Sequence, residues 1–119
     1  MKRLLVWYLP QAAFFALGAS CANAEFYSGN DLHARCRDNR AFAGGYVTGL
    51  FDASKVLEIF DDQGVLKICL PAGVMNTQLT DIVCKKLADD PKNRHSTANW
   101  LVFDALQEAY PCPKEPKKP

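Results

Sequence analysis

Hydrophobic positions between residues 32 and 60 recur at helical spacing. Intervals of three, four or their sums keep these side chains on one helix face, and the positions are Leu32, Cys36, Ala43, Tyr46 or Val47, Leu50, Ala53 and Leu57. Asp31 can cap the start of such a helix, and Asn39 and Arg40 interrupt the pattern once. The pattern predicts one long helix from Leu32 to about Phe60, ending at the Asp-Asp-Gln-Gly turn of residues 61–64.

Two shorter helices follow in the second half of the chain. One stripe, formed by Leu79, Ile82, Val83 and Leu87, predicts a helix that starts at Asn76 or Thr77 and ends before Pro91. Ser96 can cap the last helix, which stops at Pro111. The apolar positions of that helix are Ala98, Leu101, Val102, Ala105, Leu106 and Ala109.

The apolar run from residue 65 to residue 70 is ambiguous. It is compatible with a short strand, a helical turn or an irregular packed segment, and a Pro-Ala-Gly turn follows it. We expect this run to cross back over the helices. The predicted fold class is therefore all-α: a small bundle of one long and two shorter helices, with short extra turns.

Three glycines interrupt the long predicted helix. Gly44 and Gly49 have the spacing of a phosphate-binding loop, but such a loop continues with Lys and then Ser or Thr, whereas Leu50 follows here. Gly45 and Gly49 lie four residues apart and share a helix face. We therefore predict a helix-packing groove that includes Gly45, Tyr46 and Gly49 and continues to Ala53.

The first 24 residues have the features of a secretory signal peptide. Lys2 and Arg3 precede an apolar stretch, and Ala22-Asn23-Ala24 is a small-x-small cleavage site. A membrane anchor is the first alternative, but the apolar stretch is shorter than the roughly 20 residues of a span. A lipoprotein with Cys21 as the modified residue is the second, although Leu17 lies one position too far from that cysteine.

Charge and cysteine content narrow the function classes. Without Lys2 and Arg3 the 14 basic residues become 12, against 13 acidic ones, so nothing indicates nucleic-acid binding. The exported part keeps Cys36, Cys69, Cys84 and Cys112, an even number that predicts two disulfides. No C-x-x-C pair supports a zinc site or a thiol oxidoreductase. We expect no metal or cofactor, no stable membrane insertion after signal cleavage, and a disordered basic tail at residues 113–119.

Candidate functional residues gather late in the chain. The polar loop between the last two helices consists of Asp89, Asp90, Pro91, Lys92, Asn93, Arg94 and His95. Trp100 and Phe103 lie off the main stripe of the last helix, so they either extend the core or form an exposed contact patch for a partner or a second copy. His33 and His95 lack paired ligand spacing. No nucleophile with a base and an orienting group is visible, so we do not expect an enzyme.

An ordered set of short motifs runs through the chain from residue 36 to residue 113. Its elements are Cys36, Gly45-Tyr46-Val47-Thr48-Gly49, Ile68-Cys69-Leu70-Pro71, Gln78-Leu79, Leu87, Pro91, Arg94-His95-Ser96, Ala98, Ala105-Leu106 and Ala109-Tyr110-Pro111-Cys112-Pro113. In this order they resemble a known family, the Rap/Tai immunity proteins of type VI secretion systems. The resemblance implies an exported, disulfide-bonded helical protein of the periplasm that blocks the cleft of a cell-wall amidase effector and has no catalysis of its own. It also implies that the 89–95 loop enters that cleft; Pro91, Arg94 and His95 match the family pattern.

The chain departs from this family in its cysteines. Family members often carry a cysteine just before the Gly-Tyr pair, where this chain has Ala43 and Gly44, and Cys84 is additional. The disulfide pairing therefore cannot be transferred, and four cysteines allow three pairings. We favour Cys36–Cys84, which would join the long helix to the second, with Cys69–Cys112, which would attach the C-terminal end to the crossover segment.

A second resemblance gives an alternative function. Small helical periplasmic chaperones of the HdeA type also carry one cysteine early in a helix and another in a later helix. Such proteins open in acid and expose apolar surface to client proteins. The 13 carboxylates of this chain do not decide between the two function classes.

Overall fold

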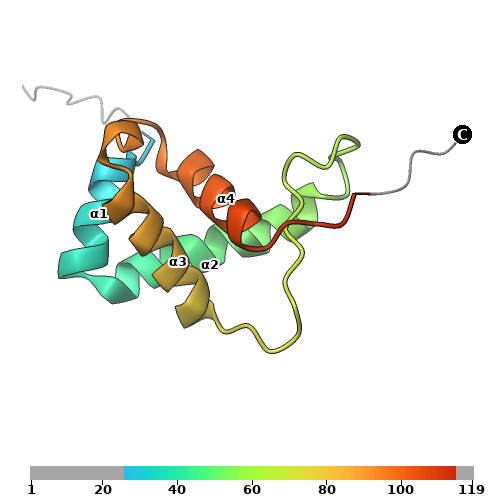
Figure 1. Cartoon of the computed structure of the whole chain (residues 1–119), viewed down its shortest axis with the longest axis horizontal. Helices are drawn as coiled ribbons and strands as arrows, with labels where there is room; N and C mark the ends of the chain where they lie inside the picture. The colour runs from blue at the N-terminus through green and yellow to red at the C-terminus, as the bar shows by residue number, and fades with distance from the viewer. Residues whose placement is uncertain (1–25, 115–119) are drawn as a thin grey trace, which may run out of the picture.

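The computed structural model describes residues 26–114, which form helices joined by turns (Figure 1). The elements are α1 (Gly29–Asp38), α2 (Arg40–Leu57), α3 (Asn76–Asp89), the 3₁₀ helix η1 (Pro91–Asn93) and α4 (Ala98–Ala109). Within residues 26–114 no β-strand forms, and one isolated bridge pairs Ser28 with Thr97. The all-α prediction is confirmed. The predicted signal peptide (1–24), Cys21 and residues 115–119 of the predicted tail lie outside the described residues.

The long helix expected from residue 32 to about residue 60 is divided into α1 and α2 at Asn39. The backbone of Asn39 leaves the helical region, with φ −146° and ψ 75°. Its amide donates to the carbonyl oxygen of Arg35 at the end of α1, and its side-chain oxygen accepts from the amide of Phe42 at the start of α2. One residue therefore ends one helix and caps the next, and α1 turns away from α2 (Figure 1). α2 ends at Leu57 and short turns follow.

All four α-helices contribute side chains to one hydrophobic core. Its fully or almost fully buried members include Leu32 from α1, Val47 from α2, Leu79, Val83 and Leu87 from α3, and Val102 and Leu106 from α4. α3 and α4 follow the predicted stripes because each stripe faces the other helices. No helix within residues 26–114 combines the length and the hydropathy needed to cross a membrane.

Two disulfides close the fold with the favoured pairing. Cys36–Cys84 joins α1 to α3 across 48 residues, and Cys69–Cys112 joins the α2–α3 connection to the chain after α4 across 43 residues. The two closed loops interleave, since Cys69 lies inside the first and Cys84 inside the second. A small domain with a modest core gains much of its stability from such cross-links.

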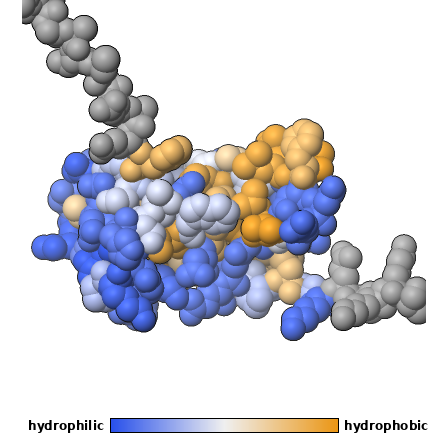
Figure 2. Space-filling view, turned by 90° about the horizontal axis from the view of Figure 1, so that it is seen from above, coloured by the Kyte–Doolittle hydropathy of each residue, from blue (hydrophilic) through white to orange (hydrophobic). Residues whose placement is uncertain are grey.

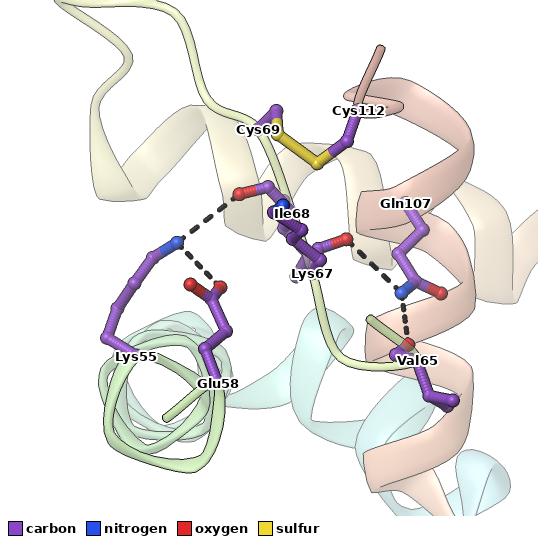
Figure 3. Close-up of a disulfide and its surroundings, with 8 residues drawn as sticks. All are labelled: Lys55, Glu58, Val65, Lys67, Ile68, Cys69, Gln107 and Cys112. Carbon is purple, nitrogen blue, oxygen red and sulfur yellow. Dashed lines mark hydrogen bonds and ion pairs between the residues drawn. A yellow bond between two sulfur atoms is a disulfide. The ribbon is translucent and has the colours of Figure 1, made fainter. Parts of the chain in front are cut away.

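The connection between α2 and α3 is an irregular packed segment, which settles the alternatives left open for the apolar run at 65–70. Ile68 is 2% exposed and joins the core. The amide of Cys69 donates to the carbonyl oxygen of Tyr110, and the Gln107 side chain donates to the carbonyl oxygens of Val65 and Lys67 (Figure 3). The C-terminal part of α4 and the chain after it thus hold this segment through its backbone.

The predicted helix-packing groove is wrong for Gly45 and Gly49. Both glycines are exposed, and among the described residues nothing lies within 4 Å of a Cβ atom placed on either. The reason is the rotation of α2: its buried face carries Ala43, Val47 and Ser54, a different side of the helix. Tyr46 is partly buried and packs its ring 5.7 Å from that of Tyr27, so it has a packing role outside any glycine groove.

Candidate functional site

The outer half of the 89–95 loop is exposed and held in shape by local bonds. Asp89 ends α3 and pairs with Lys85 at 2.5 Å, and the Asp90 carboxylate accepts from the Asn93 side chain at 2.6 Å. Pro91, with its fixed φ, starts the 3₁₀ turn η1. The side chains of Pro91, Lys92, Asn93 and His95 are exposed, and that of Asn93 is already bonded to Asp90.

The inner half of the loop is anchored to the start of α1. The amide of Asn30 donates to the carbonyl oxygen of Arg94 at 2.8 Å, and the amide of Gly29 donates to the carbonyl oxygen of Ser96 at 2.8 Å. A Cβ atom on residue 29 would lie 2.8 Å from the Arg94 oxygen and 2.3 Å from Leu101 Cδ1. Only glycine fits this close approach. The exposed half of the loop is therefore presented on a rigid support.

Arg94 also contacts α1 through its side chain. Its Nη1 lies 2.9 Å from Nδ1 of His33, while its Nε is buried and has no partner among the described residues. Arginine can only donate, so Nδ1 of His33 accepts and the imidazole proton is on Nε2. Burial lowers the pKa of His33, and the nearby Arg94 and Arg37 guanidinium groups lower it further. A neutral His33 is the form that this contact needs.

An exposed apolar surface lies where the end of α2 and the turns after it meet the start of α4. Leu57, Phe60, Val65 and Trp100 form it, and we call it the Trp100 surface. Together with Asp61 and Leu66 they line a shallow pocket of about 340 Å³. Phe60 is 78% exposed and Trp100 57%. Figure 2 shows hydrophobic side chains gathered at one end of this face of the molecule.

The two aromatic candidates of α4 have different positions. Trp100 is exposed, whereas Phe103 is 8% exposed and belongs to the core. Of the two alternatives for these aromatics, Phe103 extends the core, because the side of α4 that carries it faces the bundle, and its assignment as a partner contact is wrong. Sequence reasoning missed Leu57, Phe60 and Val65. The signal was the run Val56-Leu57-Glu58-Ile59-Phe60, which has more apolar residues than one buried helix face needs.

A second cavity, of about 650 Å³, lies beside the Cys69–Cys112 disulfide, and three polar residues of its lining, Glu58, Asp61 and Gln107, have structural roles. The Asp61 carboxylate accepts from the amide of Leu66 at 2.6 Å, and this bond lowers the pKa of Asp61. Asp61 therefore closes the turn after α2 and is not directed at a ligand.

The loop and the Trp100 surface have the features of a protein-recognition surface. Within residues 26–114 no three metal-ligating side chains gather, and both histidines of that range make the contacts His33–Arg94 and His95–Lys92 carbonyl. All four of its cysteines are in disulfides. A polar loop on a rigid support, followed by an exposed tryptophan in an apolar surface, provides the polar and apolar parts that recognition surfaces combine.

Comparison with known proteins bears on this interpretation. Neither the curated proteins nor the solved structures contain a match to the chain. The sequence model of one family, described as Rap1a immunity proteins, matches residues 28–112 and so includes every described helix up to Cys112. The chain therefore belongs to the Rap1a immunity protein family.

Proposed function

We propose that this protein is a periplasmic immunity protein that binds and blocks a peptidoglycan amidase effector of a type VI secretion system. Family membership supports an immunity role in type VI secretion and an inhibitor in place of an enzyme. Two disulfides support an oxidising compartment such as the periplasm. The observation that carries the proposal is the exposed 89–95 loop on its anchored base, a shape able to enter a cleft.

We place the partner contact on the exposed residues of the loop and on Trp100. Trp100 lies five residues after His95 and is exposed. Aromatic side chains contribute much of the binding energy in many protein interfaces. The loop would contribute polar specificity, and the Trp100 surface would contribute apolar area. For a homodimer, we propose the same Trp100 surface as the contact between the two copies of the chain.

The test starts with capture at neutral pH. The oxidised chain from Glu25 onward is immobilised and exposed to secreted and periplasmic proteins of its own cells. We expect one dominant partner that hydrolyses purified peptidoglycan amides and loses this activity when one equivalent of the chain is added. A captured partner without amidase activity would contradict the amidase part of the proposal. Many partners that bind only at about pH 3 would contradict the whole and favour the acid-chaperone alternative.

Variants then locate the contact. Lys92→Glu changes the exposed loop. Lys114→Glu makes the same charge change in the segment that follows α4. That segment lies at the end of the molecule opposite the α3–α4 connection (Figure 1). Trp100→Ala has its match in Met75→Ala, an exposed apolar residue ahead of α3. We expect the first variant of each pair to weaken inhibition at least about tenfold, or about 1.4 kcal/mol, and its control to leave inhibition unchanged. Sedimentation of Trp100→Ala and the parent protein tests the homodimer separately.

A further inference from the structure

Three nitrogen-rich side chains, two from α1 and one from the 89–95 loop, form a cluster. His33 and Arg37 lie four residues apart on α1 and therefore on one helix face. Arg94 reaches this face from the loop and bonds to His33. Arg37 is exposed, and His33 and Arg94 are partly buried.

The cluster has no acidic counterpart in the described part of the chain. Other basic side chains of the helices are paired: Arg35 with Asp38, Arg40 with Asp81, and Lys86 with Glu108. Neither Arg37 nor Arg94 has a carboxylate within ion-pair distance among residues 26–114. The charged groups that act on His33 are the guanidinium groups of Arg94 and Arg37, both positive.

The hydrogen-bonding groups of the cluster also favour an anionic ligand. The one acceptor of the cluster, Nδ1 of His33, is used by Arg94. The donors that remain accessible are Nε2–H of His33 and the exposed guanidinium of Arg37, while Nε of Arg94 is buried and has no partner among the described residues. Guanidinium groups bind carboxylates with two parallel hydrogen bonds, so an anionic acceptor would complete this cluster.

We propose that Arg37, His33 and Arg94 form a binding site for a carboxylate group of the protein partner. The identity of the source rests on the proposed function, because the cluster adjoins the loop that we expect to contact the effector. A carboxylate here would accept hydrogen bonds from the exposed guanidinium of Arg37 and from Nε2–H of His33, and its negative charge would raise the pKa of His33.

A probe peptide tests the site without the effector. The ring C–H resonances of His33 are followed by NMR at low salt, with acetylated tetraglutamate amide as the probe and the tetraglutamine peptide as the neutral control. We expect tetraglutamate to raise the pKa of His33 by about half a unit or more, which is within the range for a neighbouring opposite charge. Tetraglutamine should leave it unchanged. The resonance of His95, which lies outside the cluster, reports non-specific binding.

Variants make the result specific. Arg37→Gln removes one exposed guanidinium and no hydrogen bond within residues 26–114, so we expect the fold to be retained. Lys114→Gln is the control, because it removes a positive charge outside the cluster. We expect Arg37→Gln to reduce the peptide affinity at least threefold and Lys114→Gln to leave it unchanged. Equal responses of His33 and His95, or an Arg37→Gln protein that responds like the parent, would overturn the proposal.

Inhibition assays with the captured effector distinguish a failure of this site from a failure of the proposed function. If tetraglutamate binds as expected but no amidase is inhibited, the proposed function fails and the carboxylate site stands. If an amidase is inhibited equally well by the parent and by Arg37→Gln, the proposed function stands and the partner does not use this site.

Discussion

Gly29 and Arg94 are in direct backbone contact between α1 and the 89–95 loop. A Cβ atom on residue 29 would lie 2.8 Å from the Arg94 carbonyl oxygen, which is closer than real Cβ atoms come. The neighbouring amide of Asn30 donates to this same oxygen. The loop that we propose for partner binding is therefore positioned by the first residues of the described chain.

Gly29→Ala tests this contact. The added methyl group must displace the backbone of Arg94, and overpacking of this kind costs about 1–3 kcal/mol. We expect the free energy of unfolding, measured by urea denaturation, to fall by that amount. Inhibition of the partner should weaken too, because the loop would shift. An unchanged free energy of unfolding would show that the loop is not anchored at this point.

Gly45→Ala is the matched opposite case. Nothing in the described chain lies within 4 Å of the new methyl group, and residue 45 is inside α2. Alanine exceeds glycine in helix propensity by about 1 kcal/mol. We therefore expect a gain of roughly 0.5–1 kcal/mol in the free energy of unfolding. A loss would mean that Gly45 is packed after all, for instance against a second copy of the chain.

Trp100 and Phe103 should separate binding from stability. Phe103 is 8% exposed, and truncation of a buried phenylalanine costs about 3–5 kcal/mol. Trp100 is 57% exposed, so we expect Trp100→Ala to cost less than about 1 kcal/mol of the free energy of unfolding while weakening partner binding. Thermal unfolding and titration calorimetry with the captured partner measure the two effects. Similar losses of stability in both variants would contradict the placement of these aromatics.

Acid should destabilise the His33–Arg94 contact. Burial and two guanidinium groups lower the pKa of His33 in the folded chain. A depressed folded pKa means that the unfolded chain takes up this proton first, so the contribution is complete above the ordinary pKa of about 6.5 and is lost as the pH falls through and below that value. His33→Gln keeps an acceptor for Arg94 without the titration. We expect its stability to fall less than that of the parent between about pH 7.5 and pH 5.5, and parallel curves would refute the idea.

Loss of the Cys36–Cys84 disulfide should be costly. The bond closes a loop across 48 residues, and the chain-entropy account gives about 4 kcal/mol for a loop of this length. The Cys36→Ala, Cys84→Ala double variant therefore lowers the free energy of unfolding by about 2–5 kcal/mol. Denaturation of the oxidised variant beside the oxidised parent measures this, and a change below about 1 kcal/mol would show that α1 and α3 hold together without the bond.

Much of the fold follows from local sequence rules. The stripes of α3 and α4 predicted these helices and their buried faces, because both helices are amphipathic and end at prolines or polar caps. Asn39 is a different case. The interval between Cys36 and Ala43 continues the helical period through the break, so the pattern could not show that α1 and α2 are separate helices.

The candidate site was less predictable because tertiary packing decides exposure. Trp100 and Phe103 are three residues apart on one helix, and only the position of the bundle relative to α4 distinguishes them. The rotation of α2 similarly left Gly45 and Gly49 in open space. The contact of His33 with Arg94 joins residues 61 positions apart, and no local pattern predicts such a pair.

The interleaved disulfides have a consequence for proteolysis. A backbone cut between residues 36 and 84 leaves its two sides joined through Cys36–Cys84, and a cut between residues 84 and 112 leaves them joined through Cys69–Cys112. Any single cleavage between Cys36 and Cys112 therefore yields one covalently connected molecule and no released fragment. A nicked copy of the protein therefore keeps α1, α3 and the chain after α4 covalently connected, and the 89–95 loop remains part of the same molecule.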